Sequence, residues 1–167
     1  MRSPNAPDYT VGIVGLGAMG QGIAQVSATG GIRTYLYDAK EGAAEAGRTA
    51  ISGRIDRLVE KGRMDEADAE RAKAALVVVG SIADLAPCDA VVEAIVEDLE
   101  VKRAVFAELE AATREDAILA TNTSSIPIGA IARGLAHRGR VAGMHFFNPV
   151  PLMKLVEVIV GPDTQER

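Results

Sequence analysis

The stretch Val11-Gly-Ile13-Val14-Gly15-Leu16-Gly17-Ala18-Met19-Gly20 decides the fold of this chain. An apolar run leads directly into three glycines spaced as Gly-x-Gly-x-x-Gly, and a helix-like stretch then continues to Gly30-Gly31. Residues 32–37 are rich in strand-forming side chains, and this second stretch ends at Asp38. A strand, a tight turn, a helix, a second strand and an acidic residue in this order predict a βαβ unit.

The glycine spacing and Asp38 predict a dinucleotide site, with a separate task for each glycine. Gly15 allows the tight turn, Gly17 lets the backbone approach a pyrophosphate, and Gly20 lets helix and strand pack closely. Backbone amides and the positive end of the helix dipole then face the diphosphate. We therefore expect cofactor contacts along the whole turn, from Gly15, Leu16, Gly17, Ala18, Met19 and Gly20.

Asp38 indicates which dinucleotide binds. Its carboxylate would accept hydrogen bonds from both ribose hydroxyls of the adenosine and would repel a 2′-phosphate, so NAD is expected rather than NADP. The alternative is a ligand-free glycine turn in which Asp38 only caps the next element. All the contextual features of the dinucleotide fingerprint are present, and this favours the NAD site.

Strand-like and helix-like segments alternate along the rest of the chain. A helix is expected from about Asp98 to Ala112, and a short helix is expected to begin at Pro127, with Ser125 as its cap. Further strands are expected at 76–79, 90–94, 117–121, 141–145 and 155–160. This alternation predicts an α/β protein, a Rossmann-type doubly wound fold with a mostly parallel sheet.

A long polar excursion separates the second strand from the third. Apolar residues recur there at helical spacing, and Lys61-Gly62 ends the helix that they predict. These apolar residues are Ile51, Ile55, Leu58 and Val59. Asp65 can cap a second helix that runs toward Ala75. The excursion is therefore expected to be a helical hairpin inserted after the second strand.

Composition limits the classes of protein. The 167 residues are 48% hydrophobic and 25% charged, which indicates a globular domain. The net charge of -5 argues weakly against nucleic acid or an anionic membrane as the main partner. Cys88 is the only cysteine, so no internal disulfide is possible and an inert structural thiol is expected. No secretory signal, membrane-spanning run or metal motif is evident, and a cytoplasmic protein is expected.

Four further segments carry polar residues at the carboxyl ends of predicted strands, where open α/β sheets bind ligands. They are Val91–Glu97, Thr121–Ser125, Gly143–Pro149 and Met153–Val158. A buried strand that ends in Thr-Asn-Thr-Ser-Ser is costly unless the hydroxyl and amide groups meet partners. These segments therefore predict a second part of the site beside the dinucleotide.

These segments and the glycine turn closely resemble the 3-hydroxyacyl-CoA dehydrogenase family, from about Val11 to Pro162. The His-Phe-Phe-Asn-Pro-Val-Pro and Asn-Thr-Ser-Ser segments are far more specific than the glycine motif. The resemblance implies interconversion of (3S)-3-hydroxyacyl-CoA and 3-oxoacyl-CoA with NAD. It also implies that His145 and Glu157 form the catalytic pair and that Ser124 binds the 3-oxygen of the substrate.

The expected reaction explains those residue types. Oxidation of a secondary alcohol needs a base for the hydroxyl proton while hydride leaves for the nicotinamide, and histidine titrates near neutral pH. A carboxylate on the other ring nitrogen fixes the tautomer and stabilises the imidazolium. His145 ends one predicted strand and Glu157 lies in the next, so the pairing is feasible. Without the surrounding segments, His145 would instead be interpreted as a core or surface histidine.

The resemblance assigns roles to five more residues. Glu97 and Lys102 would lie near the nicotinamide ribose, while Asn122 and Asn148 would line the cofactor or catalytic pocket. Lys61 would contact the phosphates of coenzyme A from the helical hairpin. Substrate contacts would thus come from Ser124, Lys61 and Asn148, and Ser124 would also touch the cofactor. Ordinary polarity at helix ends explains Glu97, Lys102 and Lys61 equally well.

Members of the resembled family carry a second, mostly helical domain that forms the dimer interface and closes over the acyl-CoA. Residues 1–9 are expected to be an N-terminal tail and residues 10–167 the NAD-binding domain, with that second domain absent. At the end of the chain, Asp163 or Thr164 would cap a further helix. We therefore expect NAD binding with little or no turnover, and a homodimer only for the full-length family.

Three alternatives remain open. The 3-hydroxyisobutyrate and 6-phosphogluconate dehydrogenases begin with a similar glycine segment, although the segment that contains His145 and Asn148-Pro149 argues against them. The chain could also be a stand-alone NAD-binding or interaction module. It could finally be a fragment of a multifunctional fatty-acid oxidation protein.

Overall fold

The computed structural model describes residue 3 and residues 5–165, and its strands form one sheet in the order β3-β2-β1-β4-β5-β6-β7. Neighbouring strands from β1 to β6 pair in parallel, and β7 runs antiparallel to β6. The strands are β1 (Thr10–Val14), β2 (Arg33–Tyr37), β3 (Leu76–Val78), β4 (Ala90–Glu93), β5 (Ile118–Thr121), β6 (Val141–Phe146) and β7 (Val156–Val160). The predicted doubly wound, mostly parallel sheet is confirmed.

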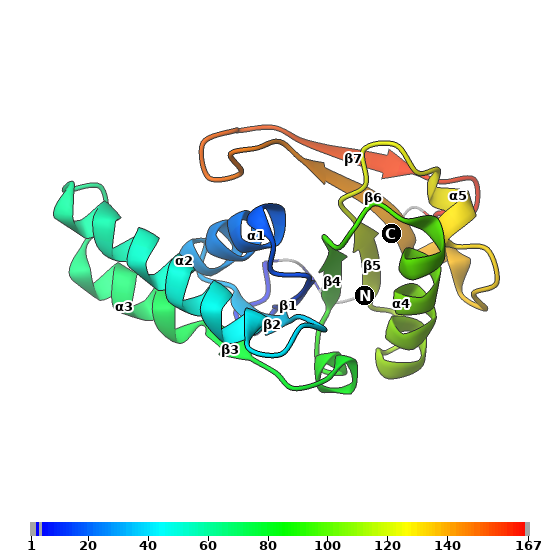
Figure 1. Ribbon diagram of the computed structural model, residues 1–167, viewed down its shortest axis with the longest axis horizontal. Helices are drawn as coiled ribbons and strands as arrows, with labels where there is room; N and C mark the ends of the chain where they lie inside the picture. Colours follow the sequence, from blue (N-terminus) through cyan, green and yellow to red (C-terminus); the bar gives the residue numbers. More distant parts are fainter. Residues whose placement is uncertain (1–2, 4, 166–167) are drawn as a thin grey trace.

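Helices cover both faces of this sheet (Figure 1). Successive side chains of a strand point to opposite faces, so Ile13 packs with α1 (Ala18–Thr29), α2 (Ala43–Glu60) and α3 (Glu66–Ala74). Its neighbour Val14 packs instead with α4 (Leu99–Ala112), α5 (Ile128–Ile131) and the short 3-10 helix η1 (Ile82–Leu85). The apolar runs of the central strands therefore serve two separate cores, as expected for a parallel sheet covered on both sides.

The helical hairpin predicted after the second strand is formed by α2 and α3, which connect β2 to β3. Lys61 follows the last residue of α2, and Gly62 adopts a left-handed φ of 63° that ends the helix. Lys73 of α3 lies 2.7 Å from Asp56 of α2 and ties the two helices together. Asp65 directly precedes α3 as predicted, but its carboxylate makes no capping hydrogen bond.

Two predicted caps have other roles. Helix α5 begins one residue later than predicted, at Ile128, and Pro127 precedes it. Ser125 does not cap this helix, because its hydroxyl donates to Glu97 at 3.0 Å. The hydroxyl of Thr164 accepts from the Gly161 amide and donates to the Val141 carbonyl, so it closes a turn. No helix begins between residue 161 and residue 165, where the described part of the chain ends.

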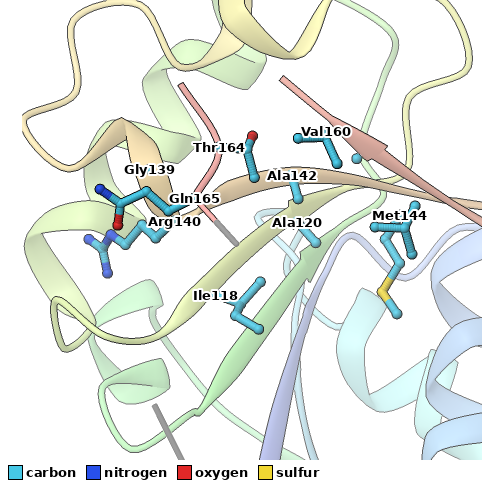
Figure 2. Close-up of a pocket in the computed structure, with 11 residues that line it drawn as sticks. Ile118, Ala120, Gly139, Arg140, Ala142, Met144, Val160, Thr164 and Gln165 are labelled. Carbon is cyan, nitrogen blue, oxygen red and sulfur yellow. The ribbon is translucent and has the colours of Figure 1, made fainter. Parts of the chain in front are cut away.

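The face of β5, β6 and β7 that lies on the same side as α1 is left open by the described residues. A hollow of about 350 Å³ occupies it, and Figure 2 shows Ile118, Ala120, Ala142 and Met144 lying along its floor. Every residue of β7 is exposed, including Val158 and Val160. None of the predicted site residues lines this apolar hollow.

Cys88 is fully enclosed between β1, η1 and β4 in the second core. Burial raises the pKa of its thiol to about 12, and the nearby Asp89 carboxylate adds to that rise. The thiol is therefore neutral at physiological pH. Among the residues described, no helix is both long and apolar enough to span a bilayer.

The surroundings of two glycines predict opposite effects of alanine substitutions on stability. A Cβ at Gly20 would lie 1.8 Å from the Gly15 carbonyl oxygen, so Gly20→Ala should cost about 1–3 kcal/mol or more of unfolding free energy. Gly53 lies inside α2, and a Cβ there would meet nothing within 4 Å, so Gly53→Ala should add about 0.5–1 kcal/mol. Urea denaturation followed by circular dichroism measures both. Equal stability of the two variants would contradict the close contact at Gly20.

Candidate functional site

Three of the seven cofactor residues predicted from the glycine motif and the acid after the second strand line one cleft, whereas Ala18 lines a different hollow. After β1 the chain builds β2 and β3 on one side and then returns to place β4 on the other side of β1. Ligands of open α/β sheets bind at this kind of switch point, beyond the carboxyl ends of the strands. A cleft of about 620 Å³ lies there, and Gly15, Gly17 and Asp38 are among the residues that line it.

Each glycine of the turn meets a different geometric need. Gly15 has a φ of 91°, which L-residues with side chains rarely adopt. Gly17 directly precedes α1, and a Cβ built on it would have no neighbour within 4 Å. This open backbone, next to the free amides of the first helical turn, fits a pyrophosphate. The side chains of Leu16 and Met19 pack in the core, so Met19 has only backbone groups to offer, and the amide of Leu16 is already donated to Asp38.

Asp38 is held in a fixed orientation at the end of β2. Its Oδ2 accepts a hydrogen bond of 2.7 Å from the Leu16 amide, and its Oδ1 accepts one of 2.9 Å from the Lys40 amide. A carboxylate has about four acceptor positions, so each oxygen can still accept one more hydrogen bond. The structure therefore leaves room on Asp38 for two ribose hydroxyls.

His145 and Glu157 lie opposite each other in the antiparallel pair of β6 and β7. The Nδ1 atom of His145 is 2.9 Å from the Oε2 atom of Glu157. An ionised carboxylate only accepts, so a neutral imidazole in this pair would carry its proton on Nδ1 and its lone pair on Nε2. The ring of Phe147 packs against the imidazole at a centroid distance of 4.7 Å. This pair has the two features of a positioned base: a free acceptor nitrogen and a partner that fixes the tautomer.

The loop after β5 is tied down on both sides of Ser124. The hydroxyls of Thr123 and Ser125 donate to the same carboxylate oxygen of Glu97. Asn122 accepts a 2.9 Å hydrogen bond from the Phe146 amide and so links this loop to the end of β6. Ser124 itself is exposed, and within the described residues its hydroxyl has no partner. The loop thus presents a free hydroxyl from a fixed backbone.

Glu97 is ionised in this arrangement. Partial burial raises the pKa of its carboxyl group, but the hydrogen bonds from Thr123 and Ser125 and the nearby Lys102 ammonium outweigh that effect. The resulting pKa lies below the ordinary value for glutamate. Glu97 therefore holds the Ser124 loop through a negative charge at neutral pH.

Lys102 lies inside the protein rather than at the open cleft. Its side chain is 1% exposed, and its Nζ is 2.7 Å from Oε1 of Glu93, which is itself fully buried. Glu93 also accepts hydrogen bonds from the Ile95 amide and the Thr121 hydroxyl. The ammonium also lies 3.4 Å from Oε2 of the exposed Glu97, so it joins a buried carboxylate to an exposed one. Lys102 thus supports the ends of β4 and β5, and its place near the nicotinamide ribose stays a prediction.

Lys61 and Asn148, both implied as substrate-binding residues, line a second hollow of about 470 Å³. The hollow lies between α1, the end of α2 and the segment after β6, and three further cations line it: Arg54, Arg57 and Arg63. The Oε1 atom of Gln25 is buried there without a hydrogen-bond partner among the described residues. Four cations and an unpaired amide oxygen suit a ligand with phosphates and at least one hydrogen-bond donor.

The arginines, Gln25 and Glu93 were not predicted from the sequence. Arg54, Arg57 and Lys61 recur at helical spacing and so lie on one side of α2, which was a recognisable signal. Gln25 and Glu93 gave weaker signals, since a polar residue in an apolar segment does not reveal its partner. No three His, Cys, Asp or Glu side chains gather closely enough to hold a metal ion in the described part of the chain.

The buried ion pair leads to a stability prediction. Lys102→Met leaves Glu93 buried without its cation, so we expect it to lower the unfolding free energy by about 3–5 kcal/mol in urea denaturation. The double variant Glu93→Gln/Lys102→Met replaces the pair with neutral groups of similar volume and should recover most of that loss. A single variant as stable as the wild type would contradict the pairing.

Comparison with known proteins identifies a family and relatives for this chain. The family model described as "3-hydroxyacyl-CoA dehydrogenase, NAD binding domain" matches residues 10–167. A 3-hydroxybutyryl-CoA dehydrogenase from Mycobacterium tuberculosis is 44% identical over 150 residues, which are 89% of this chain and 52% of that protein. A 3-hydroxyadipyl-CoA dehydrogenase from Escherichia coli is 45% identical over 152 residues, which are 91% of this chain and 32% of that protein.

Solved structures agree with this assignment. The crystal structure of a 3-hydroxybutyryl-CoA dehydrogenase from Escherichia coli has a TM-score of 0.92 and 44% identity, covering 94% of this chain and 33% of that one. A lactate dehydrogenase from Eimeria maxima shares only the fold, with a TM-score of 0.60 and 14% identity, covering 87% of this chain and 46% of its own. The cofactor expected from the sequence, NAD, agrees with the family description. The chain therefore belongs to the 3-hydroxyacyl-CoA dehydrogenase family, in the part that forms the NAD-binding domain.

Proposed function

We propose that this chain supplies the NAD site, the base and a substrate-binding serine for interconversion of (3S)-3-hydroxyacyl-CoA and 3-oxoacyl-CoA. The observation that carries the proposal is the pair of His145 and Glu157, 2.9 Å apart beside the tethered loop that presents Ser124. Relatives of this chain are named as dehydrogenases of 3-hydroxybutyryl-CoA and 3-hydroxyadipyl-CoA, which supports a substrate of this class.

The side chains divide the chemistry of alcohol oxidation between them. Nε2 of His145 accepts the hydroxyl proton, and Glu157 stabilises the imidazolium that forms. The exposed hydroxyl of Ser124 donates to the 3-oxygen and so holds carbon 3 of the substrate, which carries the hydride, in place. NAD, when bound, supplies the acceptor for the hydride. In the reverse direction, His145 returns the proton to the oxygen of the ketone.

The cofactor would lie along the glycine turn, with its adenosine ribose on Asp38 and its pyrophosphate over Gly17. The acceptor positions left on Asp38 and the open backbone of Gly17 support this placement. Glu97 is exposed at the same end of the sheet, and its Oε2, which lies 3.4 Å from Nζ of Lys102, could also accept a hydrogen bond from the nicotinamide ribose.

The phosphates of coenzyme A would lie in the hollow that contains Lys61, Arg54, Arg57 and Arg63. A chain with a net charge of -5 gathers four cations there, and none of them pairs with a carboxylate among the described residues. Phosphate groups would compensate this charge. The unpaired Oε1 of Gln25 would accept a hydrogen bond from an amide or hydroxyl of the same ligand.

The chain spans about half the length of the Mycobacterium tuberculosis relative that it matches. Glu157 is 53% exposed, and the outer side of β7 faces solvent. Exclusion of water is one of the contributions that enzymes make to such reactions, so these residues alone should turn over slowly. We propose that residues 10–167 act as one NAD-binding domain that follows a short N-terminal tail, residues 1–9.

The test is a single-turnover reaction in which acetoacetyl-CoA oxidises NADH bound to an excess of the protein. The loss of NADH fluorescence measures the rate. His145→Gln should slow the reaction by at least about 100-fold, because the group that gives the proton to the ketone oxygen is lost, while the Kd for NADH stays unchanged. His137→Gln is the matched control, since His137 is a surface residue near Glu115 that precedes β6 and so lies away from the carboxyl ends of the strands.

The outcomes separate the possible functions. NADH binding without any oxidation by the wild type would mean that this chain binds the cofactor but does not suffice for turnover. Oxidation of NADH that is equally fast in His145→Gln would show that His145 does not transfer the proton. Loss of NADH binding in His145→Gln, or unfolding of that variant, would indicate that His145 serves the core instead.

A further inference from the structure

One side chain touches both the glycine turn and the basic hollow. Gln21 lies in the first turn of α1, and its Nε2 donates a 2.8 Å hydrogen bond to the Leu16 carbonyl in the glycine turn. Its Oε1 accepts a 2.6 Å hydrogen bond from the guanidinium of Arg54 on α2. The two ends of a single amide thus join two helices and two binding sites.

The connection continues on the cofactor side. The amide of Leu16 donates to Oδ2 of Asp38 at 2.7 Å, while the carbonyl of the same residue is held by Gln21. Asp38, Leu16, Gln21 and Arg54 therefore form an unbroken run of hydrogen bonds. One end of this run is the carboxylate at the cofactor cleft, and the other is a cation of the hollow.

Arg54 depends on Gln21 for its position. Arginine loses about 2 kcal/mol of rotamer freedom when it is fixed, and no described carboxylate pairs with Arg54 to hold it. The hydrogen bond to Gln21 is therefore the contact that orients the guanidinium of Arg54. Gln21 in turn can hold it only while Leu16 keeps its own place in the turn.

We propose that Gln21 is a positioning residue that couples the two sites, so that each ligand strengthens binding of the other. A dinucleotide that orders the turn would also order Gln21 and Arg54, and the second ligand would then meet a cation that is already in place. The same run acts in the opposite direction, because coupling between two binding sites is reciprocal. This inference rests on the proposed function for the identity of the second ligand, coenzyme A.

Calorimetric titrations with NADH, carried out with and without saturating free coenzyme A, test the coupling directly. In the wild-type chain, coenzyme A should lower the Kd for NADH by about fivefold or more. Gln21→Leu removes both hydrogen bonds and should bring this ratio to one. Gln21→Glu can still pair with Arg54 but has no donor for the Leu16 carbonyl, so it too should lose the coupling.

Arg57→Leu is the matched control. Arg57 lines the same hollow and, in the described part of the chain, makes no contact with Gln21, so this variant should weaken coenzyme A binding and keep the ratio. Gln21 is half-buried on the helix surface, and Gln21→Glu serves as the test if Gln21→Leu fails to fold.

A ratio of one in the wild type, or a ratio that persists in both Gln21 variants, would overturn the coupling alone. Failure of coenzyme A to bind the wild type at any concentration tested would overturn the proposed substrate site together with this inference. A ratio that disappears with Gln21 and survives in Arg57→Leu would support the role assigned to Gln21.

Discussion

The close approach of Gly20 to the Gly15 carbonyl is the constraint on which the cofactor side of the domain depends. It lets α1 start directly above the end of β1, with Leu16 between Asp38 on one side and Gln21 on the other. The same contact leaves Gly17 facing open space at the beginning of the helix. A backbone contact with no side chain therefore determines where the carboxylate, the free amides and the start of the basic hollow lie.

The antiparallel direction of the last strand places His145, the proposed base. In a parallel sheet, neighbouring strands are joined by long crossovers, whereas β6 and β7 are antiparallel, so a short connection brings His145 directly opposite Glu157. Charges near this site follow two patterns. Glu93 and Lys102 are enclosed as a pair and hold strand ends, while the cations of the hollow have no carboxylate partner within residues 3 and 5–165. The enclosed pair supports the site, and the unpaired cations are available to a ligand.

Much of this arrangement could be predicted from the sequence. The glycine spacing, the acid after the second strand and the alternation of elements indicated the fold because each reflects local backbone geometry. The placement of Lys102 could not be predicted, since the residue that neutralises it lies nine positions earlier on another element. Similarly, the hydroxyl of Ser125 donates to Glu97 and does not cap α5. The contact of Gln21 with Arg54 joins residues on two helices, and no local pattern marks such a pair.

The central claim is that Asp38 and the glycine turn form an NAD site in this chain. Parallel calorimetric titrations with NADH and NADPH test it most directly. The account predicts that NADH binds and that NADPH binds at least about tenfold more weakly, because a phosphate replaces a ribose hydroxyl whose hydrogen bond to a carboxylate contributes about 1.5–3 kcal/mol. Equal affinity for the two dinucleotides, or no binding of NADH, would contradict it.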